Sequence, residues 1–238
     1  DGRPMRIGVS LVDATTGHFA CQAILAALYE RQTSGAGQRL EVSLFDTGVN
    51  MLVNFAASYL MAGVTPGRPG NGNLVSQPAG VYQAADGPFV LTCVGDNAFR
   101  RLCVEVLERP ELVEDPRFID NPSRLAHAVT LTHELDQQLH TLTRETWLAR
   151  LRAASIPCGE VRTVKEALES AEFQAANLAT TVDHPIAGQI RVLRSPLRMS
   201  ATPLVDPCPA PTFGEHTDEV LTELGYDEVA LAAFASDA

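Results

Sequence analysis

Asp13 is the residue whose position best suits it for covalent chemistry. It follows the apolar run 6–12 and precedes a helical pattern that starts near Gly17, so we expect it at the carboxyl end of a strand, where ligands of open α/β sheets bind. The helix dipole and the free N–H groups of a first turn would stabilise its ionised form. An ionised, partly desolvated carboxylate can attack a thioester carbonyl and form an acyl intermediate. The alternative is that Asp13 only caps the helix, which is the commoner role for Asp and which spacing alone favours.

A second candidate is the run Gly70-Asn71-Gly72-Asn73, which leads to Gln77-Pro78. A loop of this composition can fold over a bound ligand and stabilise an oxyanion with its backbone N–H groups. The alternative is an ordinary interdomain linker, which the sequence alone favours. The loop does not match the phosphate-loop pattern, and the chain holds no dinucleotide-binding fingerprint.

Histidine and cysteine give weaker signals. His18 lies near the start of the first predicted helix and could bond a neighbouring carboxylate, but a surface or core histidine is the commoner case. His127, His133 and His140 lie on predicted helices without an i, i+4 pair, so we expect no metal site. The five cysteines form no C-x-x-C pair, which favours free thiols in a reducing cytosol; they are Cys21, Cys93, Cys103, Cys158 and Cys208.

The elements around Asp13 are predicted to alternate between strand and helix. The apolar runs predict strands over 6–12 and 40–45, and the helical patterns cover 17–31 and 46–61. Thr15 or Thr16 is expected to cap the first helix, and the glycines from Gly35 to end it. This order is typical of a parallel sheet with crossover helices. Two strands alone cannot bury both faces of a sheet, so we expect further strands outside this chain.

The remainder predicts a smaller α+β unit and a return segment. Asp86-Gly87 is a strong hairpin signal between strands 81–85 and 88–93. Helices are predicted over 96–107, 122–142, 144–154 and 164–170, strands over 180–183 and 189–193, and a final helix from about Thr217.

Composition narrows the functional classes. The 238 residues are 45% hydrophobic, which can fill a core, and their formal net charge is −11. Without a dense basic run we expect no nucleic-acid binding, although a local Arg or a helix N-terminus can still hold an anionic ligand. No apolar run approaches the ~20 residues of a membrane span, and no signal peptide is visible. We therefore expect a cytoplasmic protein that is not bound to membranes.

Several blocks of the sequence, in order, resemble one enzyme family. The segment Asp1-Gly2-Arg3-Pro4 followed by RIGVSLVDATTG resembles the part of family III CoA-transferases, the formyl-CoA and carnitine CoA-transferase group, that carries a nucleophilic Asp. Later blocks resemble the same family in the same order: GQRLEVSLFD, GRPGNGNLVSQP, DGPFVLTCVGDNAFRRLC, DPRF, IPCGEV, DHP and GEHTDEVLTELGY.

The resemblance implies an α/β fold in which a smaller α+β domain interrupts a Rossmann-like large domain, with two chains interlocked as a homodimer. The expected division is 1–62 for the large domain with Asp13, 63–78 for a linker and loop, 79–175 for the small domain, and 176–238 for the return to the large domain. The resemblance also implies that no cofactor is permanently bound, since the CoA thioester is the substrate. CoA would pass from an acyl-CoA to a small carboxylic acid through mixed anhydrides and an aspartyl-CoA thioester on Asp13.

The resemblance also implies roles for four other residues. Gly70, Gly72 and Gln77 would belong to the loop that covers the site, and Leu44 would line the pantetheine arm of CoA. The loop lacks the continuous glycine run of formyl-CoA transferases, so we do not expect oxalate or formate specificity.

The match starts late in the family's sequence, and the family's N-terminal half has no counterpart here. We therefore expect the chain to be a fragment that pairs with that missing half, and the isolated chain to bind CoA weakly and to be inactive. Two alternatives stay open. One is an acyl-CoA racemase of the same fold, although DATTG resembles the transferase version of the turn. The other is a non-catalytic fragment in which Asp13 only caps a helix.

Overall fold

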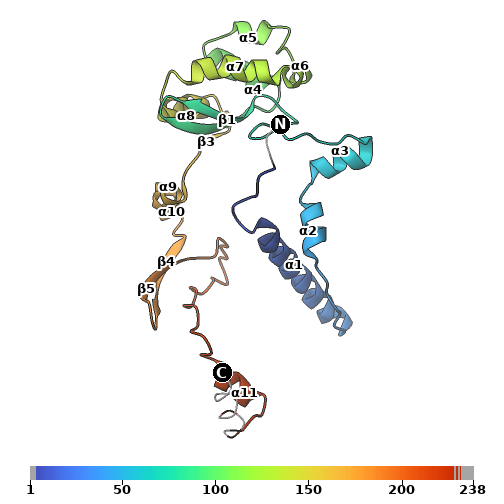
Figure 1. Cartoon of the computed structure of the whole chain (residues 1–238), viewed down its shortest axis with the longest axis vertical. Helices are drawn as coiled ribbons and strands as arrows, with labels where there is room; N and C mark the ends of the chain where they lie inside the picture. The colour runs from blue at the N-terminus through green and yellow to red at the C-terminus, as the bar shows by residue number, and fades with distance from the viewer. Residues whose placement is uncertain (1–3, 228, 230, 232–238) are drawn as a thin grey trace. The chain divides into compact units, whose positions relative to one another are not determined.

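The computed structural model describes residues 4–227, 229 and 231. By its internal contacts the chain divides into two compact units, Asp1–Val161 and Arg162–Ala238. Within the described residues there are two antiparallel sheets, one of three strands in the order β1-β2-β3 and one of two strands, β4 and β5 (Figure 1). The mixture of helix and sheet agrees with the predicted class, whereas the parallel strands expected near Asp13 are not present in this part of the chain.

The first unit begins with three helices and continues into an α+β region (residues 79–160). Its elements are α1 Leu11–Ser34, α2 Leu44–Asn50, α3 Asn54–Ala62, β1 Ala79–Ala84, β2 Gly87–Thr92, α4 Asp96–Arg101, the π-helix η1 Leu102–Val106, α5 Glu111–Glu114, α6 Asn121–Ala126, α7 Ala128–Leu139, α8 Arg144–Ala153 and β3 Cys158–Glu160. The second unit holds α9 Val164–Glu169, α10 Ala171–Ala175, β4 Ala179–His184, β5 Gly188–Leu193 and α11 Thr217–Glu223.

The prediction of strands over residues 6–12 and 40–45 is wrong. Residues 4–10 and 35–43 form neither helix nor strand, and α1 already begins at Leu11. A strand needs a neighbouring strand to satisfy its backbone N–H and C=O groups, and the described residues offer none beside either run. Apolar composition alone therefore could not make these segments strands.

The predicted cap of the first helix is also wrong, whereas its end is confirmed. Thr15 and Thr16 lie inside α1, where their hydroxyls donate to the carbonyls of Leu11 and Val12, each at 2.8 Å. This is the usual bond of a mid-helix threonine to the residue four positions earlier. At the other end Gly35 adopts a left-handed conformation with φ of 71°, which glycine alone adopts without cost and which closes a helix.

The helix predicted over 46–61 is present as two helices. Ser43 caps α2 by accepting a hydrogen bond from the backbone N–H of Asp46 at 3.0 Å. Between α2 and α3, Val53 has a φ of 45°, a value that a β-branched residue rarely adopts. This conformation breaks the helix and begins α3 in a new direction.

The structure of the α+β region confirms most of the helices and strands predicted for it. In the hairpin, Ala84 pairs with Gly87 across a turn of Ala85 and Asp86, one residue earlier than the predicted Asp86-Gly87 turn. Strand β3 pairs with β2 on its other edge. Asp120 and Thr143 cap α6 and α8 by accepting from the backbone N–H of Ser123 and Thr146. The helices predicted over 122–142 and 96–107 are each divided, the first at His127 and the second by the π-helix.

The second unit confirms the hairpin of β4 and β5, which pair from Ala179 opposite Leu193 to His184 opposite Gly188. A capping box of Thr163 and Glu166 begins α9. The predicted final helix is present as α11, and its continuation beyond residue 231 lies outside the described residues, as does the turn at residues 1–3.

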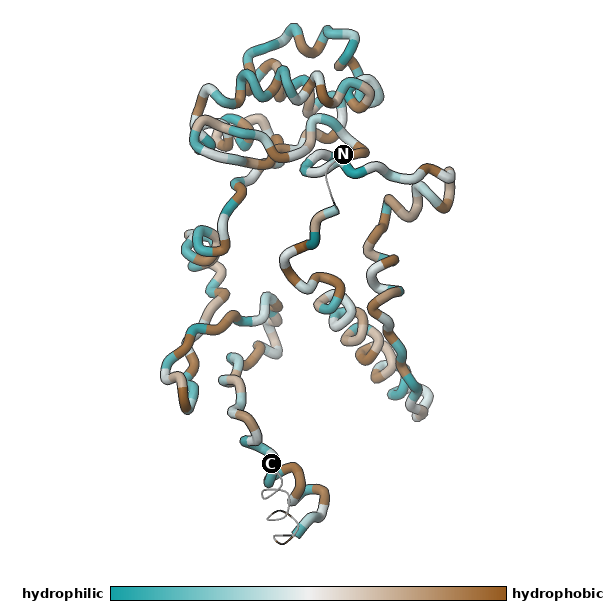
Figure 2. The backbone as a smooth tube through the Cα atoms, in the orientation of Figure 1, coloured by the Kyte–Doolittle hydropathy of each residue, from teal (hydrophilic) through white to brown (hydrophobic). Residues whose placement is uncertain are grey.

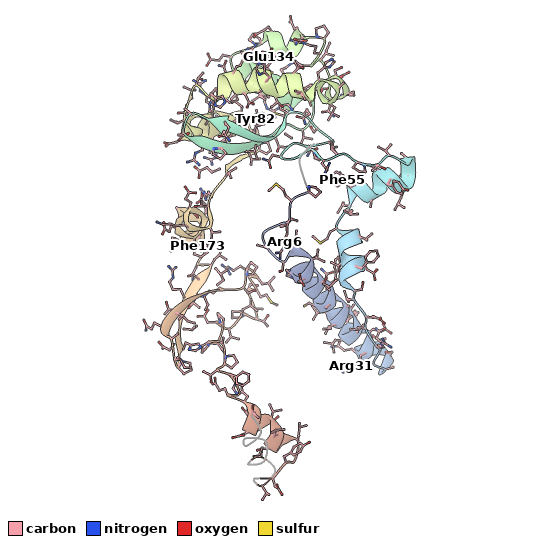
Figure 3. All side chains as sticks on the ribbon, in the orientation of Figure 1. Arg6, Arg31, Phe55, Tyr82, Glu134 and Phe173 are labelled. Carbon is pink, nitrogen blue, oxygen red and sulfur yellow. The ribbon has the colours of Figure 1, made fainter. Side chains whose placement is uncertain are left out.

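Burial is concentrated in the α+β region. Every buried hydrophobic residue of the described chain lies between Ala79 and Ile156, and Trp147, Phe89 and Leu135 are each 0% exposed. Helices α7 and α8 pack with the three-stranded sheet, and Figure 3 places Tyr82 on β1 and Glu134 on α7. Apart from Thr47, no described residue of α1, α2, α3 or the second unit is buried.

Helix α1 is apolar and uncovered. It is long and apolar enough to cross a membrane by length and composition, and none of its most apolar stretch is buried. Figure 2 shows hydrophobic positions along much of its length. The prediction that no segment approaches a membrane span is therefore too strict, although core helices of globular proteins meet the same criterion.

Two residues of α7 with opposite exposure test this description of the core of the α+β region. Leu135 and Val129 both lie on α7 and are 0% and 86% exposed. We expect Leu135→Ala to lower the free energy of unfolding by about 2–5 kcal/mol, because it leaves a cavity. Val129→Ala should change it by no more than about 0.5 kcal/mol. Denaturant unfolding followed by the fluorescence of Trp147, the single tryptophan, measures both. Equal effects of the two variants would contradict this description of the core.

Candidate active site

Asp13 lies in the first turn of α1, with Ser10 as the N-cap residue. The side chain of Ser10 makes no capping bond, so the positive end of the 24-residue helix is not neutralised there. Asp13 is exposed, and within the described part of the chain its carboxylate has no hydrogen bond or ion pair. The strand expected before it is absent, but the helix N-terminus that would stabilise its negative charge is present. The carboxylate therefore lies at a helix N-terminus without a partner among the described residues.

Leu44 belongs to a helix that packs against α1. It is the first residue of α2 and is 53% exposed. Helix α2 contacts α1, and a Cβ placed on Gly48 would lie 3.9 Å from a methyl of Val12, the neighbour of Asp13. Thr47, in the same turn of α2, is only 3% exposed. Helix α2 therefore packs against the first turn of α1 at Gly48, with room for a Cβ at this position.

The glycine loop (residues 70–78) is ordered against the α+β region. Gly70 has a φ of 62°. Asn73 Oδ1 accepts from the backbone N–H groups of Val75 and Ser76 at 2.7 and 3.2 Å, and Gln77 Nε2 donates to the carbonyl of Asn73 at 2.8 Å. Gln77 is 7% exposed. The structure brings Gly72 and Gln77 together, since a Cβ on Gly72 would lie 4.0 Å from Gln77 Nε2.

Two backbone N–H groups expected to stabilise an oxyanion are already engaged. Gly72 N–H donates to the carbonyl of Pro69 at 3.0 Å, and Gln77 N–H donates to Asn121 Oδ1 at 3.1 Å. An oxyanion donor from this loop must therefore be another N–H, such as that of Gly70 or Asn71, neither of which donates a hydrogen bond within the described residues.

The loop approaches β1 very closely at Gly80. A Cβ at this position would lie 2.8 Å from the carbonyl oxygen of Asn71, a distance that real Cβ contacts do not reach. Ser76 Oγ also donates to the carbonyl of Cys93 at 2.6 Å, and Cys93 N–H donates to the carbonyl of Pro78 at 2.8 Å. The loop is thereby fixed to both strands of the hairpin.

A hollow of about 370 Å³ lies between the glycine loop and helices α6 and α7. Leu74 and Gln77 line it from the loop, and Leu125 and Val129 line it from the helices. Its lining is apolar apart from a few polar groups such as the Gln77 carboxamide, which is the usual character of a small-molecule site.

A hollow of about 600 Å³ in the second unit is less suited to anions than its arginines suggest. The Arg194 guanidinium already holds Asp206 by two bonds of 2.7 and 2.9 Å, and this pairing lowers the pKa of Asp206. Arg198 donates to the backbone carbonyl of Ala176. Both cations are therefore committed within the unit.

Cysteine and metal chemistry receive no support from the described residues. Burial raises the pKa of the Cys93 and Cys103 thiols to about 12, so neither forms the thiolate that a nucleophile needs. No group of three or more His, Cys, Asp and Glu side chains among the described residues could hold a metal ion. His18 is exposed on α1.

Sequence reasoning missed Gly80, Asn121 and Arg124, which hold the glycine loop in place. Arg124 is 0% exposed, and its Nε donates to the carbonyl of Gln77 at 2.8 Å. The sequence around Arg124 indicated only the start of a helix, through the capping sequence Asp120-Asn121-Pro122. It did not indicate that this arginine is buried. The partner lies 47 residues away in the chain, and no spacing rule connects the two.

Comparisons with known proteins identify the family. The model of CoA-transferase family III matches residues 1–217. A succinate–glutarate CoA-transferase of Agrobacterium fabrum is 33% identical over 224 residues, which cover 94% of this chain and 56% of that protein. A formyl-CoA:oxalate CoA-transferase of Streptomyces avermitilis is 32% identical over 254 residues, covering 100% of this chain and 62% of that protein.

Solved structures give the same result. A CAIB/BAIF family protein from Brucella suis superposes with a TM-score of 0.75 and 32% identity, covering 94% of this chain and 58% of that one. An aspartate-to-alanine mutant of Rv3272 from Mycobacterium tuberculosis superposes with a TM-score of 0.78 and 30% identity, covering 91% and 56%. The chain belongs to family III of the CoA-transferases. It spans about half the length of the curated relatives it matches.

The close approach of the loop to Gly80 predicts that Gly80 and Gly159, two glycines of the same sheet, respond differently to replacement by alanine. We expect Gly80→Ala to displace the loop at Asn71 and to lower the free energy of unfolding by about 1–3 kcal/mol. Gly159, on β3, has nothing within 4 Å of an added Cβ, so Gly159→Ala should be neutral or slightly stabilising. Trp147 fluorescence during denaturation measures stability, and limited proteolysis measures cleavage near Asn71. An unchanged loop in Gly80→Ala would contradict the packing described here.

Proposed function

We propose that this chain supplies the nucleophile of a family III CoA-transferase, which moves CoA from an acyl-CoA to a carboxylic acid through an aspartyl-CoA thioester on Asp13. The observation that carries the proposal is the Asp13 carboxylate in the first turn of α1, exposed and without a partner among the described residues, in a chain of this family. The relatives named as succinate–glutarate and formyl-CoA:oxalate CoA-transferases support CoA transfer between acids. The particular donor and acceptor acids are not part of the proposal.

The first half of the reaction forms the thioester. The Asp13 carboxylate attacks the carbonyl carbon of the donor acyl-CoA, the C–S bond breaks, and a mixed anhydride and the CoA thiolate result. The thiolate then attacks the Asp13 carbonyl carbon of the anhydride. This releases the donor acid as a carboxylate and leaves CoA joined to Asp13 as a thioester.

The second half repeats these steps in reverse with the acceptor. The acceptor carboxylate attacks the Asp13 carbonyl carbon, which releases the thiolate and forms a second anhydride. Attack of the thiolate on the acceptor acyl carbon gives the new acyl-CoA and restores the Asp13 carboxylate. Charge stabilisation by the start of α1 would act on Asp13 whenever it is ionised, and the glycine loop would cover the thioester and keep water away.

The wider fold and assembly belong to the same proposal. We take α1 to α3 and residues 176–238 as parts of a Rossmann-like large domain, and residues 79–175 as the smaller domain, with residues 79–160 forming its buried core. Large apolar side chains on α1, such as Leu25 and Tyr29, are 61% and 76% exposed. They would be covered by the family's N-terminal half and by the second chain of an interlocked dimer. The cytoplasmic location and the lack of a permanently bound cofactor remain predictions.

Removal of one carboxylate tests the role of Asp13. Asp13→Asn keeps the shape of the side chain but cannot act as the nucleophile, so we expect CoA transfer to fall on the order of a thousandfold or more. Stability should fall by no more than about 1 kcal/mol, the value of a charge at a helix N-terminus. Initial rates in the longest natural form of the polypeptide and thermal unfolding measure the two effects.

Glu30→Gln provides the matched control, since it makes the same chemical change near the other end of α1. It should leave transfer within about twofold, because a single surface charge far from the start of the helix has little effect. Full activity in Asp13→Asn would disprove the proposal. Equal losses in both variants would indicate damage to the helix and not loss of a nucleophile.

A further inference from the structure

The glycine loop is held to the α+β region by two side chains of α6. Asn121 Oδ1 accepts from the N–H of Gln77 at 3.1 Å, and its Nδ2 donates to the carbonyl of Val75 at 2.9 Å. A single carboxamide therefore satisfies one donor and one acceptor of the loop backbone. We call Asn121 and Arg124 together the loop anchor.

Arg124 makes the second attachment from the interior. Its Nε donates to the carbonyl of Gln77 at 2.8 Å and its Nη1 to the carbonyl of Phe118 at 3.0 Å. Its Nη2 donates to Asp96 Oδ1 at 2.7 Å, and the guanidinium lies 4.5 Å from the centre of the Phe99 ring. The loop carbonyl is thus one of three acceptors that a fully buried cation requires.

The segment that precedes the loop has no comparable attachment. Residues 63–70 are exposed apart from the half-buried Pro66. A Cβ placed on Gly63, Gly67 or Gly70 would meet no heavy atom within 4 Å. The hydrogen bonds that tie residues 75–78 to other elements run to the α+β region, and residues 63–70 form the connection to α3.

We infer that Asn121 and Arg124 are positioning residues for the transfer reaction, because they make Gly72 and Gln77 move with the α+β region and not with the helix that carries Asp13. This inference rests on the proposed function. Covering of the thioester would then be a movement of the whole α+β region, with residues 63–70 as its connection. The loop anchor determines how well the covered state excludes water.

The competing reaction is hydrolysis of the aspartyl-CoA thioester. Water attacks the Asp13 carbonyl carbon, the C–S bond breaks, and one proton of the water passes to the departing thiolate while the other is released to solvent. The products are free CoA and the Asp13 carboxylate, with no acyl-CoA product. A loosened loop should admit water, so the ratio of CoA released to CoA transferred reports on its position.

Asn121→Ala is the informative variant. The residue is only half-buried at the start of α6, so its loss should not unfold the region. It removes both hydrogen bonds to the loop, and we expect the ratio of hydrolysis to transfer to rise about tenfold. Arg124→Lys keeps the charge but cannot reach three acceptors, and it should change the ratio in the same direction.

Gln137→Ala is the matched control, since it removes a carboxamide from α7 whose one hydrogen bond within the described residues is to the His133 ring. It should leave the ratio unchanged. A merely structural role for Asn121 would lower the amount of folded enzyme but would not change this ratio. Assays in the longest natural form of the polypeptide, with free thiol and acyl-CoA product measured in the same reaction, give both quantities.

Hydrogen exchange in the 238-residue chain tests the attachment without any activity. We expect the amide of Gln77 to exchange faster in Asn121→Ala and to be unchanged in Gln137→Ala. Unaltered exchange would overturn the loop anchor. Faster exchange with an unaltered ratio would overturn its role in positioning. A wild-type enzyme that transfers no CoA would instead overturn the proposed function, and the positioning role with it.

Discussion

The burial of the Arg124 guanidinium is the constraint on which the arrangement of the α+β region depends. An unpaired buried charge costs several kcal/mol, and here the cost is offset by three acceptors and an aromatic ring. The acceptors come from the glycine loop, from the turn before α6 and from the start of α4. One cation therefore links three segments of the chain in a single arrangement, two of them 28 and 47 residues away in the sequence, and the loop of the candidate site is among them.

A second constraint is the uneven burial of apolar surface. The α+β region covers its own hydrophobic side chains, whereas α1 leaves Leu25 61% exposed and the described part of the second unit buries no residue. Burial of apolar area contributes about 25 cal/mol per Å², so a 24-residue apolar helix without cover is far from its most favourable state. This contrast agrees with the assembly proposed above, in which the rest of the family's fold covers these helices.

Elements determined by local chemistry could be predicted, and those determined by distant partners could not. Gly35 ends α1 because its left-handed conformation is a property of glycine. Asp86-Gly87 correctly indicated a hairpin, although the turn residues are Ala85 and Asp86 and Gly87 begins β2. The runs 6–12 and 40–45 have the composition of strands, but a strand also needs a neighbour, which the described residues do not provide. The role of Arg124 depends on Gln77, 47 residues earlier, and no local pattern contains that information.

The features of the candidate site were likewise predicted only in part. Asp13 was singled out by its position between an apolar run and a helix, and by the resemblance, and it does lie at a helix start. Its expected strand and its expected threonine caps were wrong. Gly72 and Gln77 lie together as the loop interpretation requires, although their N–H groups are engaged within the α+β region.

Covalent trapping tests the central claim most directly. The longest natural form of the polypeptide would be incubated with a panel of acyl-CoAs, quenched with hydroxylamine or borohydride, and mapped by mass spectrometry. The account predicts a hydroxamate or a reduced aspartate at Asp13 with at least one donor. An unmodified Asp13 with every donor, in protein shown to bind CoA, would contradict it and would favour a racemase or a non-catalytic relative.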